Sequence, residues 1–317
     1  MRLPDFLLIG AMKCGTTTLF MDLCAHPRVF MPDDKEPHNL CDDNVLTDEG
    51  RREYAALFAP ARPDQKCGEA STGYTKLPTR TGVVERARKV LGPDLRLIYI
   101  VREPVARIVS HHYHLYSNGR TGKVIEDTLR KDPRLIDYTR YATQVEPWID
   151  AYGLDAVLIV RFESFIKDRR GHAAALHRHL GIEERPEVVN EDASANRGEG
   201  KPVARGLTGF FRSPLYKKVV RGLAPAGARK WAQRTLLSKA PDRPGPPRPE
   251  TVERILDELA PECERLGRIM GVSGPVWDPN EVRRRFGAND GSAGSPESPA
   301  ARRGATSPAS EARSAEE

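Results

Sequence analysis

The stretch LLIGAMKCGTTTLF, residues 7–20, decides the fold of this chain. A short apolar run leads into Gly10, four residues follow, and Gly15 then precedes three threonines that open a helical pattern. Gly10 allows a sharp backbone turn after a strand, and Gly15 allows the backbone to approach a ligand closely. The first N–H groups of a helix bind anions, because they lack partners and lie at the positive end of the helix dipole. The stretch therefore predicts a phosphate-binding loop between a strand and a helix.

The lysine of this loop stands in an unusual place. In the nucleotide triphosphatase pattern G-x-x-x-x-G-K-[ST] it follows the second glycine, whereas here that position is Thr16 and the lysine is Lys13. The apolar run at residues 95–101 ends in Arg102, where such enzymes need an acidic residue for Mg²⁺. We therefore expect a phosphorylated ligand that needs no metal; the alternative, a glycine turn without a ligand, is disfavoured by the lysine and the three threonines. The expected phosphate contacts are Lys13, Cys14, Gly15, Thr16, Thr17 and Thr18.

Apolar runs and helical patterns alternate along the chain. The runs predict buried parallel strands, and the patterns between them predict helices. Such alternation is typical of an α/β protein, so we expect a P-loop-type three-layer fold with a central parallel sheet flanked by helices. The expected strands are residues 6–9, 29–31, 95–101 and 156–160, and the expected helices are residues 16–25, 48–58, 80–91, 104–116, 136–152, 164–180 and 249–270.

The composition suits one domain with a basic segment and a tail. The chain has 317 residues, 39% of them hydrophobic, and a formal net charge of +6, which favours anionic ligands. We expect a single domain over residues 1–286 and a disordered tail over residues 287–317, where Gly, Ser, Pro, Ala and charged residues prevail. Residues 200–249 hold twelve Lys or Arg and one acidic residue, and we expect this segment to cover the nucleotide or the substrate.

The five cysteines form no CxxC pair and have no zinc-finger spacing. No apolar run reaches the ~18 residues of a spanning helix. Free thiols are typical of a reducing compartment, so we expect a cytoplasmic protein without a structural metal.

A second basic site is expected where the run at residues 95–101 ends. Parallel strands of an open α/β sheet present ligand-binding residues at this edge, which places Arg102 there. Ser110 lies about two turns along the helix that follows. A guanidinium fork and a hydroxyl together predict binding of a second, separate phosphate.

These two motifs together resemble those of sulfotransferases. Lys13-Cys-Gly-Thr-Thr-Thr-Leu is similar to their 5′-phosphosulfate loop, and RLIYIVREPVARIVSHHYHLY, residues 96–116, is similar to their 3′-phosphate site. The resemblance covers roughly residues 5–180, with a weaker match to about residue 270. It implies 3′-phosphoadenosine 5′-phosphosulfate (PAPS) as the donor, adenosine 3′,5′-bisphosphate (PAP) as the product, and in-line sulfuryl transfer without a metal.

A closer resemblance is to the heparan sulfate sulfotransferase group and its bacterial relatives. Lys35-Glu-Pro-His-Asn-Leu40 looks like the segment that carries the catalytic glutamate of that group. The resemblance implies that Glu36 is the general base, that Lys13 stabilises the bridging oxygen of the leaving phosphate, and that His38 orients the acceptor or replaces Glu36 as base. Without the resemblance, Glu36 would be a solvated loop carboxylate.

Cys67-Gly-Glu-Ala-Ser-Thr-Gly-Tyr74 resembles the glutamate-lysine-threonine-proline segment of the same group. Ala70 stands where the group has its lysine, so one contact to the transferred group or the substrate is missing. Lys66 and Lys76 are the candidates that could supply it.

In related enzymes a loop after residue 196 covers the nucleotide. The resemblance thus offers Arg197, Lys201 and Arg205 as further nucleotide contacts. Residues 215–223 mix basic and apolar side chains, which suits a membrane surface, an acidic acceptor or a solvated helix face. The expected partner is a small-molecule or glycan acceptor, such as a carbohydrate, glycolipid or secondary metabolite, modified on a hydroxyl rather than an amine.

Two other classes of function stay open at this point. One is a P-loop kinase or other phosphotransferase, which Thr16 and Arg102 disfavour. The other is a non-enzymatic nucleotide- or nucleic-acid-binding protein that uses residues 200–249. We expect no nucleic-acid partner, because that segment offers few aromatic side chains for stacking. The histidines at positions 111, 112 and 114 look like a metal cluster, but no carboxylate or cysteine completes a ligand set, and packing or substrate contact is expected. The sequence specifies neither the acceptor nor the oligomeric state.

Overall fold

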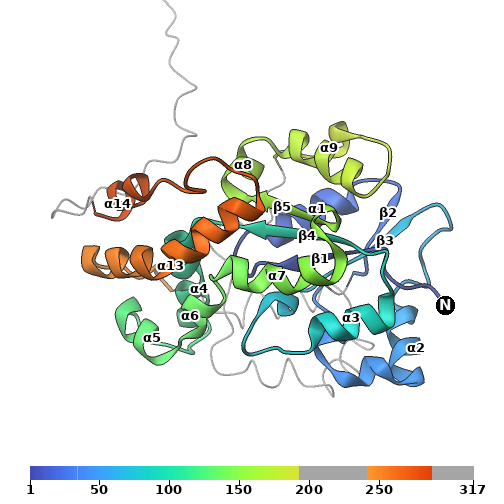
Figure 1. The fold of residues 1–317 in the computed structure, drawn as a ribbon, viewed down its shortest axis with the longest axis horizontal. Coiled ribbons are helices and arrows are strands. Elements are labelled where there is room, and N and C mark those ends of the chain that lie inside the picture. Colours follow the sequence, from blue (N-terminus) through green and yellow to red (C-terminus); the bar gives the residue numbers. More distant parts are fainter. Residues whose placement is uncertain (34, 193–240, 288–317) are drawn as a thin grey trace, which may run out of the picture.

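The computed structural model describes residues 1–33, 35–192 and 241–287. Within these residues five strands form one sheet in the order β2-β3-β1-β4-β5, and every neighbouring pair is parallel (Figure 1). The α/β fold with a central parallel sheet is therefore confirmed. The strands are β1 (Phe6–Gly10), β2 (Val29–Phe30), β3 (Lys66–Ala70), β4 (Arg96–Val101) and β5 (Val157–Arg161).

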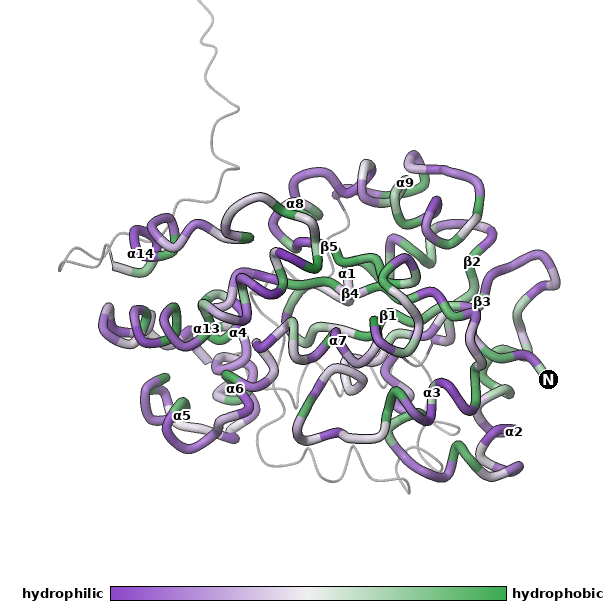
Figure 2. Tube along the Cα trace, in the orientation of Figure 1, coloured by the Kyte–Doolittle hydropathy of each residue, from purple (hydrophilic) through white to green (hydrophobic). Residues whose placement is uncertain are grey.

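The centre of the sheet is its most apolar part. β1 lies between β3 and β4, and its side chains from Phe6 to Ile9 are fully buried. Figure 2 shows the hydrophobic colour concentrated along β1 and β4, while the outer helices carry mostly polar residues. Strands buried on both faces need continuous apolar runs, and this explains why these two strands were predictable from the sequence.

Helices cover both faces of the sheet. α1 and α9 pack together on one side, and α3 and α7 pack together on the other, which gives three layers (Figure 1). The helices are α1 (Thr16–Cys24), α2 (Asp48–Ala56), α3 (Val83–Leu91), α4 (Pro104–Ser117), α5 (Ile125–Lys131), α6 (Arg134–Asp137), α7 (Tyr141–Tyr152), α8 (Phe162–Lys167), α9 (Arg169–His179), α13 (Pro249–Ile269) and α14 (Pro279–Gly287). Short 3₁₀ turns occur at Asn39–Cys41, Asp43–Leu46, Thr72–Thr75, Leu154–Ala156 and Pro186–Val188.

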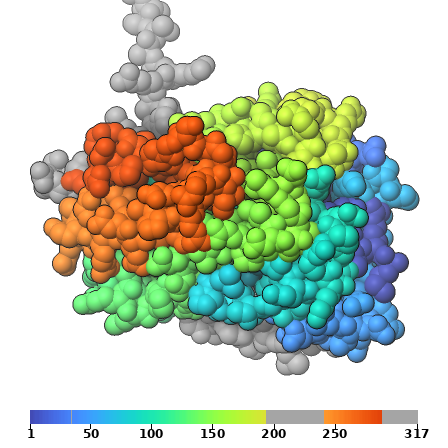
Figure 3. Space-filling view, viewed as in Figure 1, coloured from blue at the N-terminus to red at the C-terminus, as the bar shows by residue number. Residues whose placement is uncertain are grey.

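A second apolar cluster lies beside the sheet. Buried side chains of α4, α5, α13 and α14 meet there, among them Val105, Leu129, Ile255 and Val282. In the space-filling view the C-terminal helices cover one end of the molecule (Figure 3). The helix predicted at residues 249–270 is thus confirmed, but it is followed by α14, which the sequence analysis did not anticipate.

Three expectations need correction. The strand β3 was missed, because KCGEA contains no apolar run; Gly68 faces the Phe6 ring, where a Cβ would lie 2.0 Å from Cζ. The helix expected at residues 164–180 is two helices, since the Asp168 side chain accepts a hydrogen bond from Gly171 N (2.8 Å) and starts α9. The helix expected at residues 136–152 is also divided, into α6 and α7.

Other expectations lie outside the described residues. The segment 193–240 includes most of the basic region, and residues 288–317 make up nearly all of the expected tail. The single-domain assignment therefore stays a prediction. In the described part of the chain, no helix is both long enough and apolar enough to span a membrane.

Candidate active site

The phosphate loop joins β1 to α1 at the carboxyl edge of the sheet. Gly15 caps α1 with a φ of 94°, a left-handed conformation that favours glycine. The Phe162 ring packs against it, so that a Cβ on Gly15 would lie 2.6 Å from Phe162 Cδ2. The absence of a side chain at Gly15 therefore lets the loop pass close to the Phe162 ring just before α1 begins. The first N–H groups of α1 have no partners within the helix, as a phosphate-binding loop requires.

Lys35 reaches this loop from a distant part of the sequence. Its Nζ donates to the hydroxyl oxygens of Thr16 and Thr17, both at 3.2 Å, and lies 3.7 Å from Glu36 Oε1. Lys35 was not predicted as a site residue, because nothing in the sequence except its position before Glu36 connects it with the phosphate loop. The ammonium group joins the phosphate loop to the expected base.

Three consecutive residues, the last of β3 and the two that follow it, hold Glu36 and His38 in place. Ala70 O accepts from Glu36 N (2.9 Å), Ser71 Oγ accepts from His38 N (3.2 Å), and Thr72 Oγ1 donates to Glu36 Oε1 (3.2 Å). Glu36 and His38 both have left-handed backbones, with φ of 65° and 60°. Non-glycine residues persist there only when their surroundings fix them. The segment 70–72 therefore supports the shape that presents both side chains.

A buried carboxyl group lies behind this support. Glu69 accepts hydrogen bonds from Ser71 Oγ (2.5 Å) and from the Tyr54 hydroxyl. Burial raises the pKa of Glu69, which its hydrogen bonds only partly oppose. Because Ser71 also binds the backbone of His38, this network ties the site to the core of the fold.

The charges of Glu36 and His38 stabilise each other. Glu36 Oε2 lies 3.4 Å from His38 Nε2. Burial raises the pKa of Glu36, but the hydrogen bond from His38 and the charges of Lys35 and Lys76 outweigh it and lower the pKa to about 2. The adjacent Cys41 thiol and the Glu36 carboxylate raise the pKa of His38 to about 9, against the effect of burial. At neutral pH the pair is a carboxylate and an imidazolium.

Arg102 lies beside the phosphate loop, as expected from its place after β4. Its Nη1 donates to Lys13 O at 3.4 Å, and its guanidinium carbon lies 4.8 Å from the centroid of the Phe162 ring that also covers Gly15. Tyr141 fixes the backbone here, since its hydroxyl donates to Arg102 O at 2.8 Å. Ser110, on the second turn of α4, is half-buried.

Cys14, inside the loop, is fully buried. Burial raises the pKa of its thiol to about 11, so the group is an uncharged thiol at neutral pH. Its Sγ lies 3.5 Å from the Tyr141 hydroxyl. This residue packs the loop against α7 and offers no nucleophile.

A basic cavity of about 290 Å³ opens next to the loop and Glu36. It is lined by residues from the phosphate loop, from the 3₁₀ turn Thr72–Thr75 and the turn after it, and from α4 to α6, together with His38. None of the described lining residues is acidic. Its lining is Met12, His38, Gly73, Lys76, Thr79, Arg80, His111, His114, Leu115, Arg120, Arg134 and Tyr138. An anionic group would be attracted into such a cavity.

Two of the three histidines of α4, His111 and His114, line this cavity, and His112 lies elsewhere. His111 lines the cavity and stacks on Tyr138, with ring centroids 6.0 Å apart. Burial, with the charge of Arg107, lowers the pKa of His111 to about 2, so it is neutral. His112 instead lies 3.1 Å from Lys123 O through Nε2. Among the described residues no group of three His, Cys, Asp or Glu side chains could hold a metal ion.

The family model for the sulfotransferase domain matches residues 3–206, more than half of the chain. The chain belongs to the sulfotransferase domain family. This match confirms the class of enzyme domain predicted from the sequence, for which PAPS stays the expected donor. The alternatives of a kinase and of a non-enzymatic binding protein are therefore not supported.

Relatives of this sulfotransferase domain act on glycans according to their names. Mouse (Mus musculus) heparan sulfate glucosamine 3-O-sulfotransferase 3B1 is 26% identical over 238 residues, which cover 72% of this chain and 58% of the relative. Human (Homo sapiens) heparan sulfate glucosamine 3-O-sulfotransferase 6 is 25% identical over 269 residues, which cover 81% of this chain and 69% of the relative. The chain thus spans little more than half the length of the mouse relative.

A solved structure has the same fold. The sulfotransferase from Alicyclobacillus acidocaldarius matches with a TM-score of 0.61 and 21% sequence identity, covering 90% of this chain and 100% of that one. At this identity the likeness concerns the fold alone.

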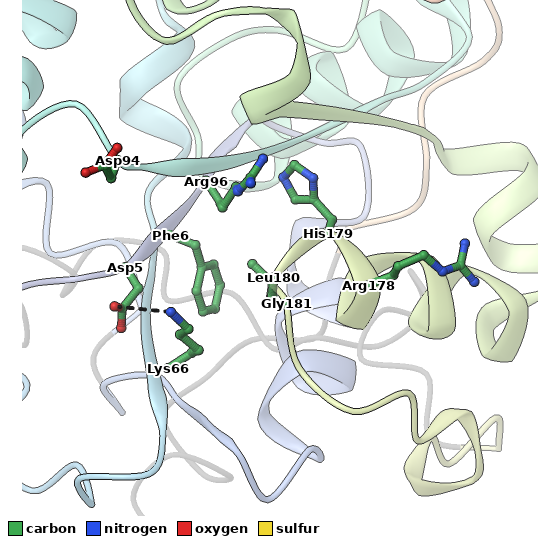
Figure 4. A pocket seen from close by; sticks show the side chains of 9 residues that line it. All are labelled: Asp5, Phe6, Lys66, Asp94, Arg96, Arg178, His179, Leu180 and Gly181. Atoms are coloured by element: carbon green, nitrogen blue, oxygen red, sulfur yellow. Dashed lines mark ion pairs between the residues drawn. The ribbon is translucent and has the colours of Figure 1, made fainter.

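Lys66 and Lys76, the two candidates to replace the lysine that the heparan sulfate sulfotransferase group has at the position of Ala70, lie in different parts of the structure. Lys76 lines the basic cavity, and its charge contributes to the low pKa of Glu36. Lys66 begins β3 at the opposite edge of the sheet, where it pairs with Asp5 at 3.8 Å. Figure 4 shows Lys66 in a different cavity of about 310 Å³, together with Phe6, Arg96 and His179. Of these two candidates, Lys76 and not Lys66 lies near Glu36.

Three expected nucleotide contacts lie outside the described residues. They are Arg197, Lys201 and Arg205, and the segment 215–223, considered for membrane contact, lies there too.

Proposed function

We propose that this sulfotransferase moves the sulfuryl group of PAPS to a hydroxyl of an acceptor bound in the basic cavity, with Glu36 as the general base. One observation carries the proposal: the Glu36 carboxylate lies between the phosphate loop and the cavity. Lys35 connects it to the loop, and His38 and Lys76 connect it to the cavity. A base must lie within hydrogen-bond reach of the acceptor hydroxyl, and that hydroxyl must lie next to the transferred group.

The residues around the loop suit the two phosphates of PAPS. Lys13, Lys35, the threonine hydroxyls and the start of α1 offer cations and donors for the 5′-phosphosulfate. Arg102 and Ser110 offer a guanidinium and a hydroxyl for the 3′-phosphate. PAPS supplies an activated sulfuryl group, and Lys13 would stabilise the charge that develops on the leaving phosphate. Each of these roles rests on position and charge.

Glu36 is a better candidate for the base than His38. A general base must be unprotonated, and the Glu36 carboxylate is ionised at neutral pH because its pKa is lowered to about 2. The same low pKa makes it a weak base, so its position next to the phosphate loop carries the assignment. His38, with a pKa of about 9, is protonated at neutral pH and cannot accept a proton. His38 would instead orient Glu36 and the acceptor through its ring N–H.

The cavity favours an acceptor that carries a negative charge of its own. Lys76, Arg80 and Arg120 line it without an acidic residue among those described. A carbohydrate, glycolipid or secondary metabolite with a hydroxyl near an anionic group fits this description, and the names of the relatives agree with a carbohydrate. Transfer to an amine is less consistent, because a protonated amine would meet these cations. The cytoplasmic location stays a prediction.

The experiment that tests the proposal is a transfer assay with radiolabelled PAPS against fractionated acceptors, performed with a metal chelator. We expect label in an acidic acceptor, with a mass gain of one SO₃ group. Transfer only to cationic or uncharged acceptors would contradict the assigned cavity, and loss of transfer in the chelator would contradict the metal-free mechanism.

A further inference from the structure

Two arginine side chains are buried among the described residues, and they differ in how their charge is balanced. Arg169, on α9, is 5% exposed and forms a two-point ion pair with Asp22, including Nε to Oδ2 at 3.0 Å. Arg107, on α4, is 0% exposed. A buried charge is costly unless a partner of opposite charge accompanies it. Arg169 has such a partner.

Arg107 makes only neutral contacts. Its Nε donates to Met12 O of the phosphate loop (3.2 Å), and its Nη1 donates to Leu135 O (2.9 Å) and Thr139 Oγ1 (3.0 Å). Its Nη2 is buried and has no hydrogen-bond partner among the described residues. No carboxylate of the described chain lies within 4.0 Å of the guanidinium, which burial does not discharge because arginine remains protonated in proteins.

The groups next to Arg107 do not balance its charge at neutral pH. Cys14 and Tyr141 are buried groups whose pKa values burial raises, so both are uncharged. His111 is neutral because its pKa is about 2. The acidic residues outside the described part of the chain are Asp34, Glu199 and five in residues 288–317.

Arg107 occupies a position beneath the nucleotide site. It holds the carbonyl of Met12, the residue before Lys13, and it lies on the helix that follows Arg102 and carries Ser110. We propose that the bound nucleotide is the counter-charge of Arg107, so that this arginine is a positioning residue whose charge no described side chain balances and PAPS or PAP does. The inference rests on the phosphate site of the proposed function.

Two consequences distinguish this role from simple packing. A charge in a low-dielectric environment acts over several ångströms and is screened little by salt, unlike the exposed cations of the site. The positive charge itself should therefore matter more than the hydrogen bond to Met12. A ligand stabilises the fold to an extent set by its affinity, so a loss of PAP affinity at Arg107 should also reduce the rise in melting temperature that PAP produces.

The test compares variants of both buried arginines by calorimetry with PAP. Arg107→Met removes the charge, Arg107→Gln removes it but keeps a donor, and Arg107→Lys keeps the charge but not the fork. We expect the first two to bind PAP at least about tenfold more weakly, with the loss persisting at high salt, and Arg107→Lys to retain most of the affinity. The rise in melting temperature with PAP should shrink in Arg107→Met and Arg107→Gln.

Arg169→Met is the matched control, because it also removes a buried guanidinium. We expect it to lower the melting temperature of the free protein and to leave PAP affinity unchanged. Equal losses of PAP affinity in Arg107→Lys and Arg107→Met would overturn the counter-charge role, as would unchanged affinity in Arg107→Gln. If Arg102→Ala also bound PAP like the wild type, the proposed phosphate site itself would be wrong, so the two failures are distinguishable.

Discussion

The Nζ atom of Lys35 lies 3.2 Å from the Thr17 hydroxyl oxygen, which joins two segments that the sequence separates by 18 residues. The next residue after the lysine is Glu36, whose carboxylate lies 3.7 Å from the same ammonium. The phosphate loop and the expected base are thus parts of one charged network. A change at Lys35 should therefore affect both the binding of the donor and the pKa of Glu36.

We predict that Lys35→Met weakens PAP binding by about tenfold, because it removes one cation from the phosphate loop. It should also raise the pKa of Glu36, since the Lys35 charge helps to lower it. Calorimetry with PAP measures the first effect. Lys35→Arg serves as the control that keeps the charge, and wild-type affinity in Lys35→Met would show that Lys35 does not contact the ligand.

The Glu36–His38 pair should be visible in solution. An NMR titration of His38 is expected to give a pKa of about 9 in the wild type and a lower value in Glu36→Gln, because the carboxylate is one cause of the increase. An unchanged His38 pKa in this variant would mean that the two side chains do not interact.

The same pair predicts how stability depends on pH. The His38 pKa is raised from 6.5, so its contribution is complete below pH 6.5 and is lost as the pH rises through about 9. The Glu36 pKa is lowered from 4.5, so its contribution is complete above pH 4.5 and is lost as the pH falls through about 2. The difference in unfolding free energy between wild type and Glu36→Gln should therefore be largest between pH 4.5 and pH 6.5, where both contributions are complete. Urea titrations that found this difference largest above pH 9 would contradict the pairing.

Lys76 and Lys66 form a matched pair of substitutions. Lys76→Met should lower transfer by about tenfold or more, because the ammonium lies in the cavity near Glu36. Lys66→Met should leave transfer unchanged, since Lys66 pairs with Asp5 at the other edge of the sheet (Figure 4). The measurement is the transfer rate of each variant with the acceptor identified in the transfer assay. A larger loss of transfer in Lys66→Met than in Lys76→Met would show that Lys66, not Lys76, replaces the missing lysine.

Arg96 and Arg102 lie at opposite ends of β4: Arg96 begins the strand, and Arg102 follows its last residue. Arg102→Ala should weaken PAP binding by roughly a hundredfold, the effect of losing a charge-assisted pair of hydrogen bonds. Arg96→Ala should not change it, because Arg96 is exposed at the start of β4 and donates to Asp155 O at 3.0 Å. Similar losses in both variants would point to a general effect of net charge rather than a site.

The sequence was informative where local chemistry alone defines structure. Gly10, Gly15 and the apolar run of β1 predicted the loop, and β4 predicted the place of Arg102. β3 escaped because its burial depends on the partners of Gly68 and Glu69: the first fits under the Phe6 ring, and the second is satisfied by Ser71 and Tyr54. Both contacts are made with residues outside β3, so the five residues of the strand show no sequence pattern that would predict it.

The site was only partly predictable for a similar reason. Glu36 and His38 came from a resemblance. Lys35 became apparent, and Lys76 could be preferred to Lys66, only when segments distant in sequence met. Lys35 lies on Thr16 and Thr17 because the chain after β2 returns to the phosphate loop. Burial of Arg107 without a carboxylate also depends on α4, α6 and the loop packing together. Such contacts are properties of the tertiary structure.

The central claim is most directly tested by one comparison, Glu36→Gln against the wild type, in a buffer that contains a metal chelator. Calorimetry should find the same affinity for PAP in both proteins, because glutamine keeps the size of the side chain while the phosphate contacts remain. Transfer from radiolabelled PAPS should fall by roughly a hundredfold or more, since the base is lost. Transfer by Glu36→Gln at the wild-type rate would contradict the assignment of Glu36 as the general base.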